Sequence, residues 1–276
     1  MGMTINTNVA SLNAQRNAAT NDSALATSLQ RLSSGLRVNS AKDDAAGLAI
    51  ASRMDSQARG MNVAVRNAND GVSLVQTAES GMAVIGDMLQ RMRELAVQAS
   101  NGTNTSNDLS ALQNEYDALN TEISRTMSAV QFNGTNLLTT TVAFTFQIGA
   151  NTGQTASIGS ADISITATVN AMTAASALVT TAAAENSAKI ATLDTAIQGI
   201  NSSRAKVGAV QNRFNYSISY LQAASENQQA AKGRIMDADF AVETANLSRA
   251  QILRQAGAAM VAQANQLPQG VLALLR

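Results

Sequence analysis

The chain has 276 residues, and its 19 lysines and arginines balance 19 aspartates and glutamates, so the formal net charge at pH 7 is zero. A neutral chain offers no basic field to attract nucleic acid or anionic lipid. Histidine and cysteine are both absent. Their absence excludes disulfides, imidazole or thiolate catalysis, and the usual ligands of a zinc site.

The sequence also argues against a membrane span and a cleaved secretory signal. It contains no run of about 18 apolar residues. Residues 1–8 lack a basic region followed by an apolar one. We therefore expect no membrane insertion, and export without a cleaved signal peptide.

The first predicted element is an N-terminal helix. Its apolar residues recur at helical spacing along one seam, and they are Ile5, Val9, Leu12, Leu25, Leu29, Leu32 and Leu36. Ser40 and Asp43 then have the spacing of a helix-capping box, and Asp44 adds negative charge at the positive end of the helix that follows. A second helix is therefore expected to begin next to these residues.

That second helix is predicted to be long. Apolar residues lie alternately four and three residues apart over 54–75 and, after one shorter step, over 78–99. A seven-residue repeat keeps one seam of a helix buried against its neighbours. Similar spacing predicts further helices over 109–130 and 193–221, with residues 101–108 forming the turn after the long helix.

The middle of the chain differs in kind. Between residues 134 and 184 only Asp162 is charged. Alternating apolar residues over 142–148 and 163–169 flank a turn sequence at 151–153, which predicts two strands of a small β-hairpin packed against helices. The predicted fold is mainly α: a long antiparallel coiled-coil-like helical bundle with a small β-hairpin region in the middle of the chain.

A regular apolar stripe also runs along the C-terminal segment, through Leu253, Gly257, Met260, Ala264, Leu267, Val271 and Leu274. Pro268 lies inside this stripe and is expected to bend the helix without ending it. Chain ends are usually frayed, and two lone surface helices would leave both terminal stripes in water. We therefore expect burial against other copies, either in an open helical filament or in a coiled-coil dimer.

Several ordered segments resemble bacterial flagellin. They include LSSGLRVNSAKDDAAGLAI at 32–50 and QRMRELAVQ at 90–98, and others lie at 5–15, 131–134, 146–151, 208–214, 246–252 and 262–276. The dense matches at 32–50 and 246–276 favour flagellin proper. The resemblance covers roughly residues 1–160 and 190–276. It implies a structural subunit that polymerises into the extracellular flagellar filament for swimming motility. A hook-associated protein, which joins hook and filament, is the alternative of the same export class.

The resemblance also implies a domain division and a set of partners. Residues 1–42 and 241–276 match the helices of the filament core, called D0. The D1 region comprises helices at 43–140, a β-hairpin region at 141–170 and a C-terminal helix at 171–240. The implied partners are further copies in a helical homopolymer, an export chaperone with the type III export apparatus, and hook-associated and cap proteins.

A further implication of the resemblance concerns the host receptor Toll-like receptor 5, for which Arg91, Leu95 and Glu115 match the recognition patch. Arg91 and Leu95 lie four residues apart and share one side of a helix. An arginine beside an exposed leucine is a plausible anchor for a protein partner. The alternative is an ordinary solvated helix face.

No group of residues predicts catalysis, a metal site or a cofactor site. Asp43 and Asp44 are explained by the start of a helix. Asp237 and Asp239 lie two residues apart, so their carboxylates would diverge on a helix. We therefore expect a protein that is not an enzyme, with no catalytic residues, metal ligands or cofactor.

Overall fold

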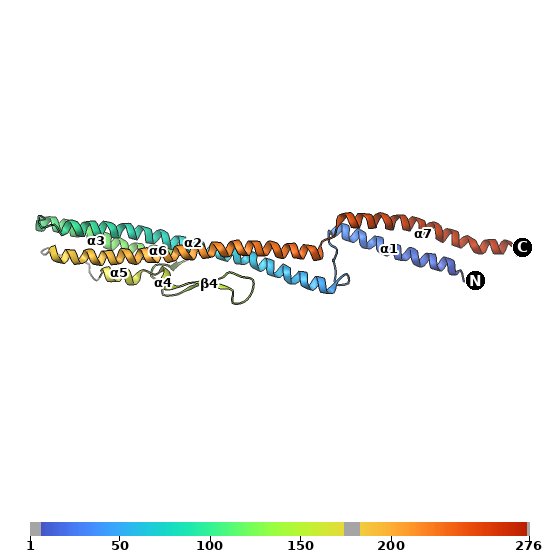
Figure 1. Ribbon diagram of the computed structural model, residues 1–276, viewed down its shortest axis with the longest axis horizontal. Coiled ribbons are helices and arrows are strands. Elements are labelled where there is room, and N and C mark those ends of the chain that lie inside the picture. Colours follow the sequence, from blue (N-terminus) through green and yellow to red (C-terminus); the bar gives the residue numbers. More distant parts are fainter. Residues whose placement is uncertain (1–6, 174–182, 275–276) are drawn as a thin grey trace. The chain divides into compact units, whose positions relative to one another are not determined.

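The computed structural model describes residues 7–173 and 183–274, without the side chains of 171–173, 183–185, 187 and 267–274. The chain forms two compact units, residues 57–226 and residues 1–56 together with 227–276. The described part is mainly helical, with two small antiparallel sheets, which confirms the predicted fold class (Figure 1). Within the described residues, no helix combines the length and hydropathy of a membrane span.

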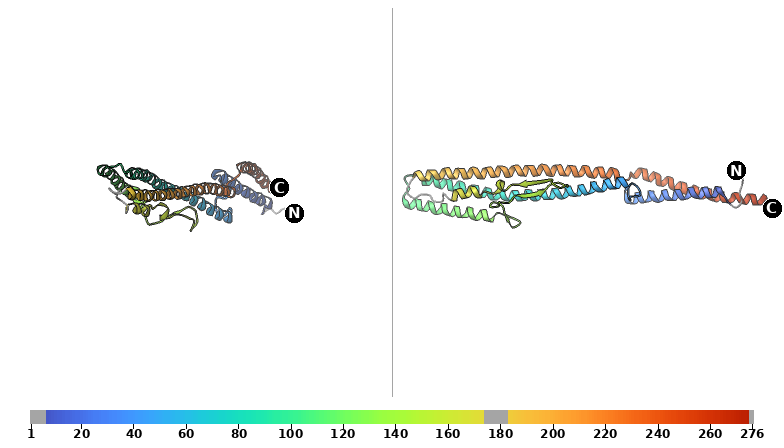
Figure 2. Two further views of the ribbon diagram at one scale, coloured as in Figure 1. Left: turned by 60° about the vertical axis from the view of Figure 1, so that its left-hand side comes forward. Right: turned by 90° about the horizontal axis from the view of Figure 1, so that it is seen from below.

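The larger unit is built around three long helices. They are α2 (Ala45–Ala99), α3 (Ser106–Ala129) and α6 (Ala183–Met236), and the parts of α2 and α6 in this unit run side by side (Figure 2). The predicted seam of α2 supplies much of the core, through the buried residues Ala68, Val75, Ala78, Met82, Ile85, Leu89, Met92, Ala96 and Ala99. The seven-residue repeat thus does the packing expected of it.

The turn between α2 and α3 ends in a helix cap. Thr105 accepts a hydrogen bond from the amide of Asp108, and the Asp108 carboxylate accepts one in return from the Thr105 amide at 2.9 Å. This reciprocal arrangement satisfies amides that the first turn of a helix leaves without partners. It fixes the start of α3 at Ser106.

The β region differs from the prediction in its second strand. β3 (Phe144–Gln147) pairs with β4 (Thr155–Ile158) around a turn in which Gly153 has φ +84°. The predicted strand over 163–169 is wrong, because these residues lie in and between α4 (Ser160–Ile163) and α5 (Thr166–Thr173). Ile165 and Val169 are both buried and lie four residues apart, so the same apolar spacing also suits a helix.

A second, smaller hairpin follows α3. β1 (Gln131–Phe132) pairs with β2 (Thr135–Asn136). The two residues between the strands, Asn133 and Gly134, have φ values of 48° and 77°. Positive φ at both positions is the signature of the type I′ turn that suits a two-residue hairpin loop.

The smaller unit pairs the two ends of the chain. α1 (Val9–Ser34) contacts α7 (Phe240–Leu274), and α7 continues through Pro268. Gly35, with φ +72°, ends α1. The two compact units meet at residues 56–57 and 226–227, which are not the expected boundaries between D0 and D1. The D0 and D1 division therefore stays a prediction.

The start of α2 corrects the predicted cap. Asp44, not Ser40, caps the helix, because its Oδ1 accepts a hydrogen bond from the Gly47 amide at 2.8 Å. Ser40 and Asp43 instead close a separate turn, in which the Ser40 amide and hydroxyl both donate to Asp43 Oδ2 at 3.0 Å. The Ser40–Asp43 spacing therefore identified real hydrogen bonds, but these bonds close a turn before α2 and do not cap it.

We predict opposite effects of the same substitution at two glycines of α2. A methyl group at Gly71 would lie 2.9 Å from Cζ of the buried Phe214, whereas one at Gly86 would meet only Ile200 Cγ2 at 3.8 Å. Gly86→Ala should stabilise the fold by up to about 1 kcal/mol through helix propensity. Gly71→Ala should destabilise it by about 1–3 kcal/mol through overpacking. Urea unfolding followed by circular dichroism measures both; equal shifts would contradict the described packing.

Candidate assembly surface

The interface between α1 and α7 is made of small and polar side chains. Ser11, Leu25, Ser28, Ala250 and Ala264 are the buried residues of the two helices in this part, apart from Glu243. A Cβ atom at Gly257 would lie 3.8 Å from the Cβ of Ala18, so the two helices approach closely there. Only one large aliphatic side chain, Leu25, is therefore enclosed within the described part of the pair.

The larger apolar side chains of the same helices lie outside that interface. Val9 is 66% exposed and Met260 61% exposed. The full set of large apolar residues exposed on α1 and α7 is Val9, Leu12, Leu29, Phe240, Val242, Ile252, Leu253 and Met260. We call this set the terminal apolar surface. It is the candidate functional site of the chain.

The predicted assembly residues fall into three groups. Val9, Leu12, Leu29, Leu253 and Met260 belong to the terminal apolar surface. Leu25 is buried within the helix pair and Leu32 is half-buried, so neither presents a fully open side chain. The third group lies outside what the structure describes: all of Ile5, and the side chains of Leu267, Val271 and Leu274.

Phe240, Val242 and Ile252 were missed by the sequence reasoning. That reasoning followed a single seam with four- and three-residue spacing along the C-terminal segment. A helix that packs against one partner and also keeps apolar residues free has apolar side chains on more than one side. A search for apolar residues off the main seam would have found these three.

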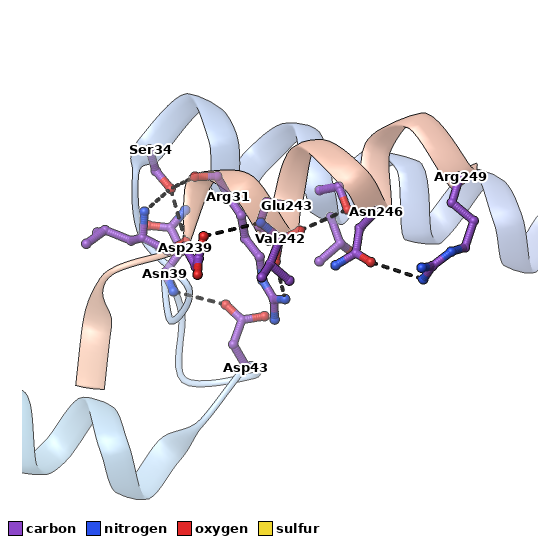
Figure 3. Close-up of polar contacts among 12 residues, drawn as sticks. Arg31, Ser34, Asn39, Asp43, Asp239, Val242, Glu243, Asn246 and Arg249 are labelled. Carbon is purple, nitrogen blue, oxygen red and sulfur yellow. Dashed lines mark hydrogen bonds and ion pairs between the residues drawn. The ribbon is translucent and has the colours of Figure 1, made fainter. Parts of the chain in front are cut away.

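Polar contacts fix the register of the α1–α7 pair at both ends. Near one end, Asn8 Nδ2 donates to the carbonyl of Ala264 and Ser11 Oγ donates to Asn265 Oδ1, both at 2.7 Å. Near the other end, the Glu243 carboxylate accepts a hydrogen bond from Arg31 Nη1 at 2.9 Å (Figure 3). It accepts another from Ser28 Oγ at 3.1 Å. Sliding one helix along the other would break both sets.

Glu243 is the chemically unusual residue of this pair, because its carboxylate is almost wholly enclosed. Burial alone would raise the pKa of Glu243, but the hydrogen bonds from Arg31 and Ser28 outweigh it and hold that pKa below its ordinary value. Beside this contact lies a pocket of about 310 Å³, also lined by Asn246 and Arg249. Arg249 Nη1 donates to Asn246 Oδ1 at 3.2 Å.

The structure brings together two of the three residues of the expected receptor patch. Arg91 Nε lies 2.8 Å from Glu115 Oε1 across α2 and α3, and Arg91 Nη1 lies 3.0 Å from Glu94 Oε2. These hydrogen bonds raise the pKa of Arg91 above its ordinary value. Arg91 and Glu115 form a solvent-exposed ion pair.

Leu95 does not belong to that exposed surface. Its side chain is 1% exposed and lies in the main core. The expectation of an exposed leucine beside Arg91 is therefore wrong. A helix enclosed by two neighbours buries a second stripe beside its main seam, and Leu95 lies next to the seam residue Ala96 on that stripe.

The paired aspartates have structural roles. Hydrogen bonds from Ser40 and Asn39 lower the pKa of Asp43. Asp237 and Asp239 lie in the break between α6 and α7, not on one helix as expected, and Asp239 Oδ1 accepts from the Ala241 amide at 2.9 Å. In the described part of the chain, no group of three or more acidic side chains is placed to hold a metal ion.

Comparison with known families assigns both ends of the chain. Residues 5–143 match the bacterial flagellin N-terminal helical region, and residues 190–275 match the bacterial flagellin C-terminal helical region. A flagellin of Halalkalibacterium halodurans is 44% identical over 275 residues, which cover 99% of this chain and all of the relative. A flagellin of Bacillus subtilis is 42% identical, with 99% of this chain and all of the relative covered.

Two solved structures are also similar. The crystal structure of Bacillus cereus flagellin aligns with a TM-score of 0.50 and 33% identity, covering 56% of this chain and 88% of that one. A putative flagellar hook-associated protein from Vibrio parahaemolyticus aligns with a TM-score of 0.61 over 71% of this chain and all of that one. Its 13% identity makes this second match evidence for the fold alone.

We predict that the α1–α7 pair loses stability in acid. Because the folded pKa of Glu243 lies below its ordinary value, its contribution is complete above about pH 5 and is lost as pH falls through the folded pKa. Glu243→Gln should destabilise the pair at neutral pH by about 1.5–3 kcal/mol, the range for hydrogen bonds to charged groups. It should also flatten the acid dependence.

Thermal unfolding at 222 nm, scanned from neutral to acid pH, tests this prediction. The exposed Glu226→Gln serves as the matched control and should keep the acid dependence of the unchanged chain. An acid transition that survives in Glu243→Gln would show that other carboxylates cause it.

Proposed function

Because this chain belongs to the bacterial flagellins, the structural subunits of the flagellar filament, we propose that it polymerises outside the cell into the filament used for swimming. The observation that carries this proposal is the terminal apolar surface. Its eight side chains are all among the exposed large hydrophobic residues. Other copies of the chain are the partners that can cover it.

The free energy available from covering this surface is large. Burying one large aliphatic or aromatic side chain contributes about 1.5–3 kcal/mol relative to leaving it exposed. Several such side chains per copy offset the cost of association. The helix pair itself, which encloses mainly small and polar groups, gains little from its own interior.

The distribution of the surface favours an open polymer over a dimer. A two-fold dimer covers the same single patch on each copy, whereas head-to-tail contacts that do not close propagate into a filament. Here the exposed apolar residues are spread over both α1 and α7. In a head-to-tail arrangement, the exposed residues of the two helices can contact different neighbours.

The remaining partners follow from the same surface. Before assembly the apolar stripe of α7 would be an aggregation hazard, so we propose that an export chaperone with a groove for amphipathic helices covers it. Export then proceeds through the flagellar type III apparatus, as is general for flagellins. Hook-associated proteins and a cap protein meet the two ends of the polymer.

The alternative is a hook-associated protein, which ends or joins a polymer without extending it. The fold shared with one such protein, at 13% identity, does not distinguish the two functions. Identity above 40% to flagellins along almost the whole chain favours the filament subunit. Seeded growth separates the two: a filament subunit elongates filament fragments without limit, and a junction protein stops after one layer.

We also propose recognition by Toll-like receptor 5, through the exposed Arg91–Glu115 pair. This ion pair spans α2 and α3 and offers charged groups of both signs. Leu95 can support the patch only by holding α2 in place from the core. Recognition is a response of the host and is separate from filament formation.

We predict that charge placed in the terminal apolar surface blocks assembly. Leu253→Asp with Met260→Asp should abolish seeded elongation, because each added copy would bury unpaired carboxylates. Val142→Asp is the matched control, since Val142 is 66% exposed but lies outside the terminal helices. Electron microscopy measures filament length. Circular dichroism should show the helices intact, so that a loss of elongation reports on this surface. Normal elongation by the double variant would refute the role of this surface.

A separate prediction concerns the receptor. Arg91→Ala should weaken activation of Toll-like receptor 5 in a reporter assay by about tenfold or more, the loss expected for an interface anchor. Arg125→Ala is the control, because Arg125 is an exposed arginine paired with Glu122 on one face of α3. Equal responses to both variants would remove Arg91 from the patch.

A further inference from the structure

Two asparagine–glycine pairs of this chain differ in conformation but not in exposure. Asn101 and Gly102 lie between α2 and α3, and Asn133 and Gly134 form the turn between β1 and β2. All four residues are exposed to solvent. We propose that Asn101 is a site of spontaneous deamidation and that Asn133 is protected by its turn. This proposal goes beyond the filament function and does not depend on assembly.

The reaction needs only water. The backbone nitrogen of the glycine attacks Cγ of the preceding asparagine, and Nδ2 leaves as ammonia when the five-membered succinimide forms. Water then opens either ring carbonyl, which yields aspartate or isoaspartate. One water is consumed, one ammonia is released and a neutral amide becomes a carboxylate. Glycine is the residue that hinders the attack least, because it has no side chain.

Ring closure places a strict demand on the backbone. The attacking nitrogen and the Cβ atom of the asparagine must lie on the same side of the Cα–C bond. Asn133 has φ 48°, in the left-handed region where ψ is about +47°. At that ψ the nitrogen of Gly134 lies on the opposite side of the bond from Cβ, so it cannot reach Cγ.

The β1–β2 ladder holds Asn133 in that conformation. Phe132 pairs with Thr135 and Gln131 with Asn136 on either side of the turn. Asn136 Nδ2 also donates to the carbonyls of Met127 and Ser128, at 3.0 Å and 2.9 Å, which ties the hairpin to the end of α3. Asn133 can react only after this hairpin opens.

Asn101 lies outside any β ladder. Its backbone hydrogen bonds run from its amide to the Gln98 carbonyl and from the Asn104 amide to its carbonyl, both at 3.2 Å. Among the described residues Asn133 is the one non-glycine with positive φ, so Asn101 is free of the left-handed conformation. No described group accepts a hydrogen bond from the amide of Gly102, and a Cβ atom built there would meet nothing within 4 Å. The attacking nitrogen is therefore unblocked.

The side chain of Asn101 is also polarised for attack. Its Oδ1 accepts a hydrogen bond from the Thr103 amide at 3.4 Å, which draws electrons from Cγ. The carboxylate formed would lie directly after α2, where the last carbonyl groups carry partial negative charge. Asn104 Nδ2 and Asn186 Nδ2 donate to two of these carbonyls, those of Gln98 and Ala99. Deamidation thus adds charge repulsion at this end of α2.

The test compares the folded full-length chain with the same chain unfolded in urea, both incubated in mildly alkaline buffer. Peptide mass spectrometry follows each asparagine, and an isoaspartate-specific methyltransferase detects the rearranged product. In urea both sites should react at similar rates. In the folded chain Asn101 should keep a rate within a few-fold of that value, while Asn133 slows by at least about tenfold, since it must wait for local opening.

Gly102→Ala provides the matched variant, because the structure has open space for the added methyl group. It should slow the reaction at Asn101 and leave Asn133 and the helical content unchanged. The proposal is overturned if Asn133 reacts as fast as Asn101 in the folded chain. It is also overturned if folding protects Asn101 as strongly as Asn133.

Discussion

The α1–α7 pair is held together by small and polar groups, and this constraint decides how the rest of its surface behaves. Serine and alanine side chains let the helices approach closely, but they bury little apolar area. The large apolar residues of the same helices are consequently left outside, where they include Val9 and Met260. A pair built in this way encloses little apolar area and leaves its main apolar surface to partners.

The larger unit follows the opposite arrangement. Its core contains large side chains from all three long helices, including Met82 of α2, Ile123 of α3 and Phe214 of α6. Phe214 also packs edge-on against Phe146, with ring centroids 5.7 Å apart. This unit therefore encloses large apolar side chains of its own. One chain thus combines a bundle with a large apolar core and a helix pair whose large apolar residues are mostly exposed.

The sequence predicted the features that depend on local spacing. The seven-residue repeat of α2 identified its buried seam, because the period of a helix is set by the backbone alone. It could not identify Leu95 as buried, since a second buried stripe depends on how α3 and α6 pack around α2. Residues 163–169 were wrongly predicted as a strand for a related reason. In a short run, apolar residues four apart fit both the two-residue period of a strand and one turn of a helix.

Glu243 shows why the polar contacts between α1 and α7 could not be predicted from the sequence. A single carboxylate on a helix usually lies in solvent, and its partner Arg31 is 212 positions away in the sequence. In the free chain Arg31 is still 31% exposed, so water screens part of its charge. Neighbours that cover the terminal apolar surface would also remove water from the adjoining pocket. Without that water, Arg31 and Glu243 would depend more strongly on each other, because an unpaired buried charge is far more costly than a paired one. The same contact that sets the register of the helix pair would then also discriminate against copies joined in a shifted register.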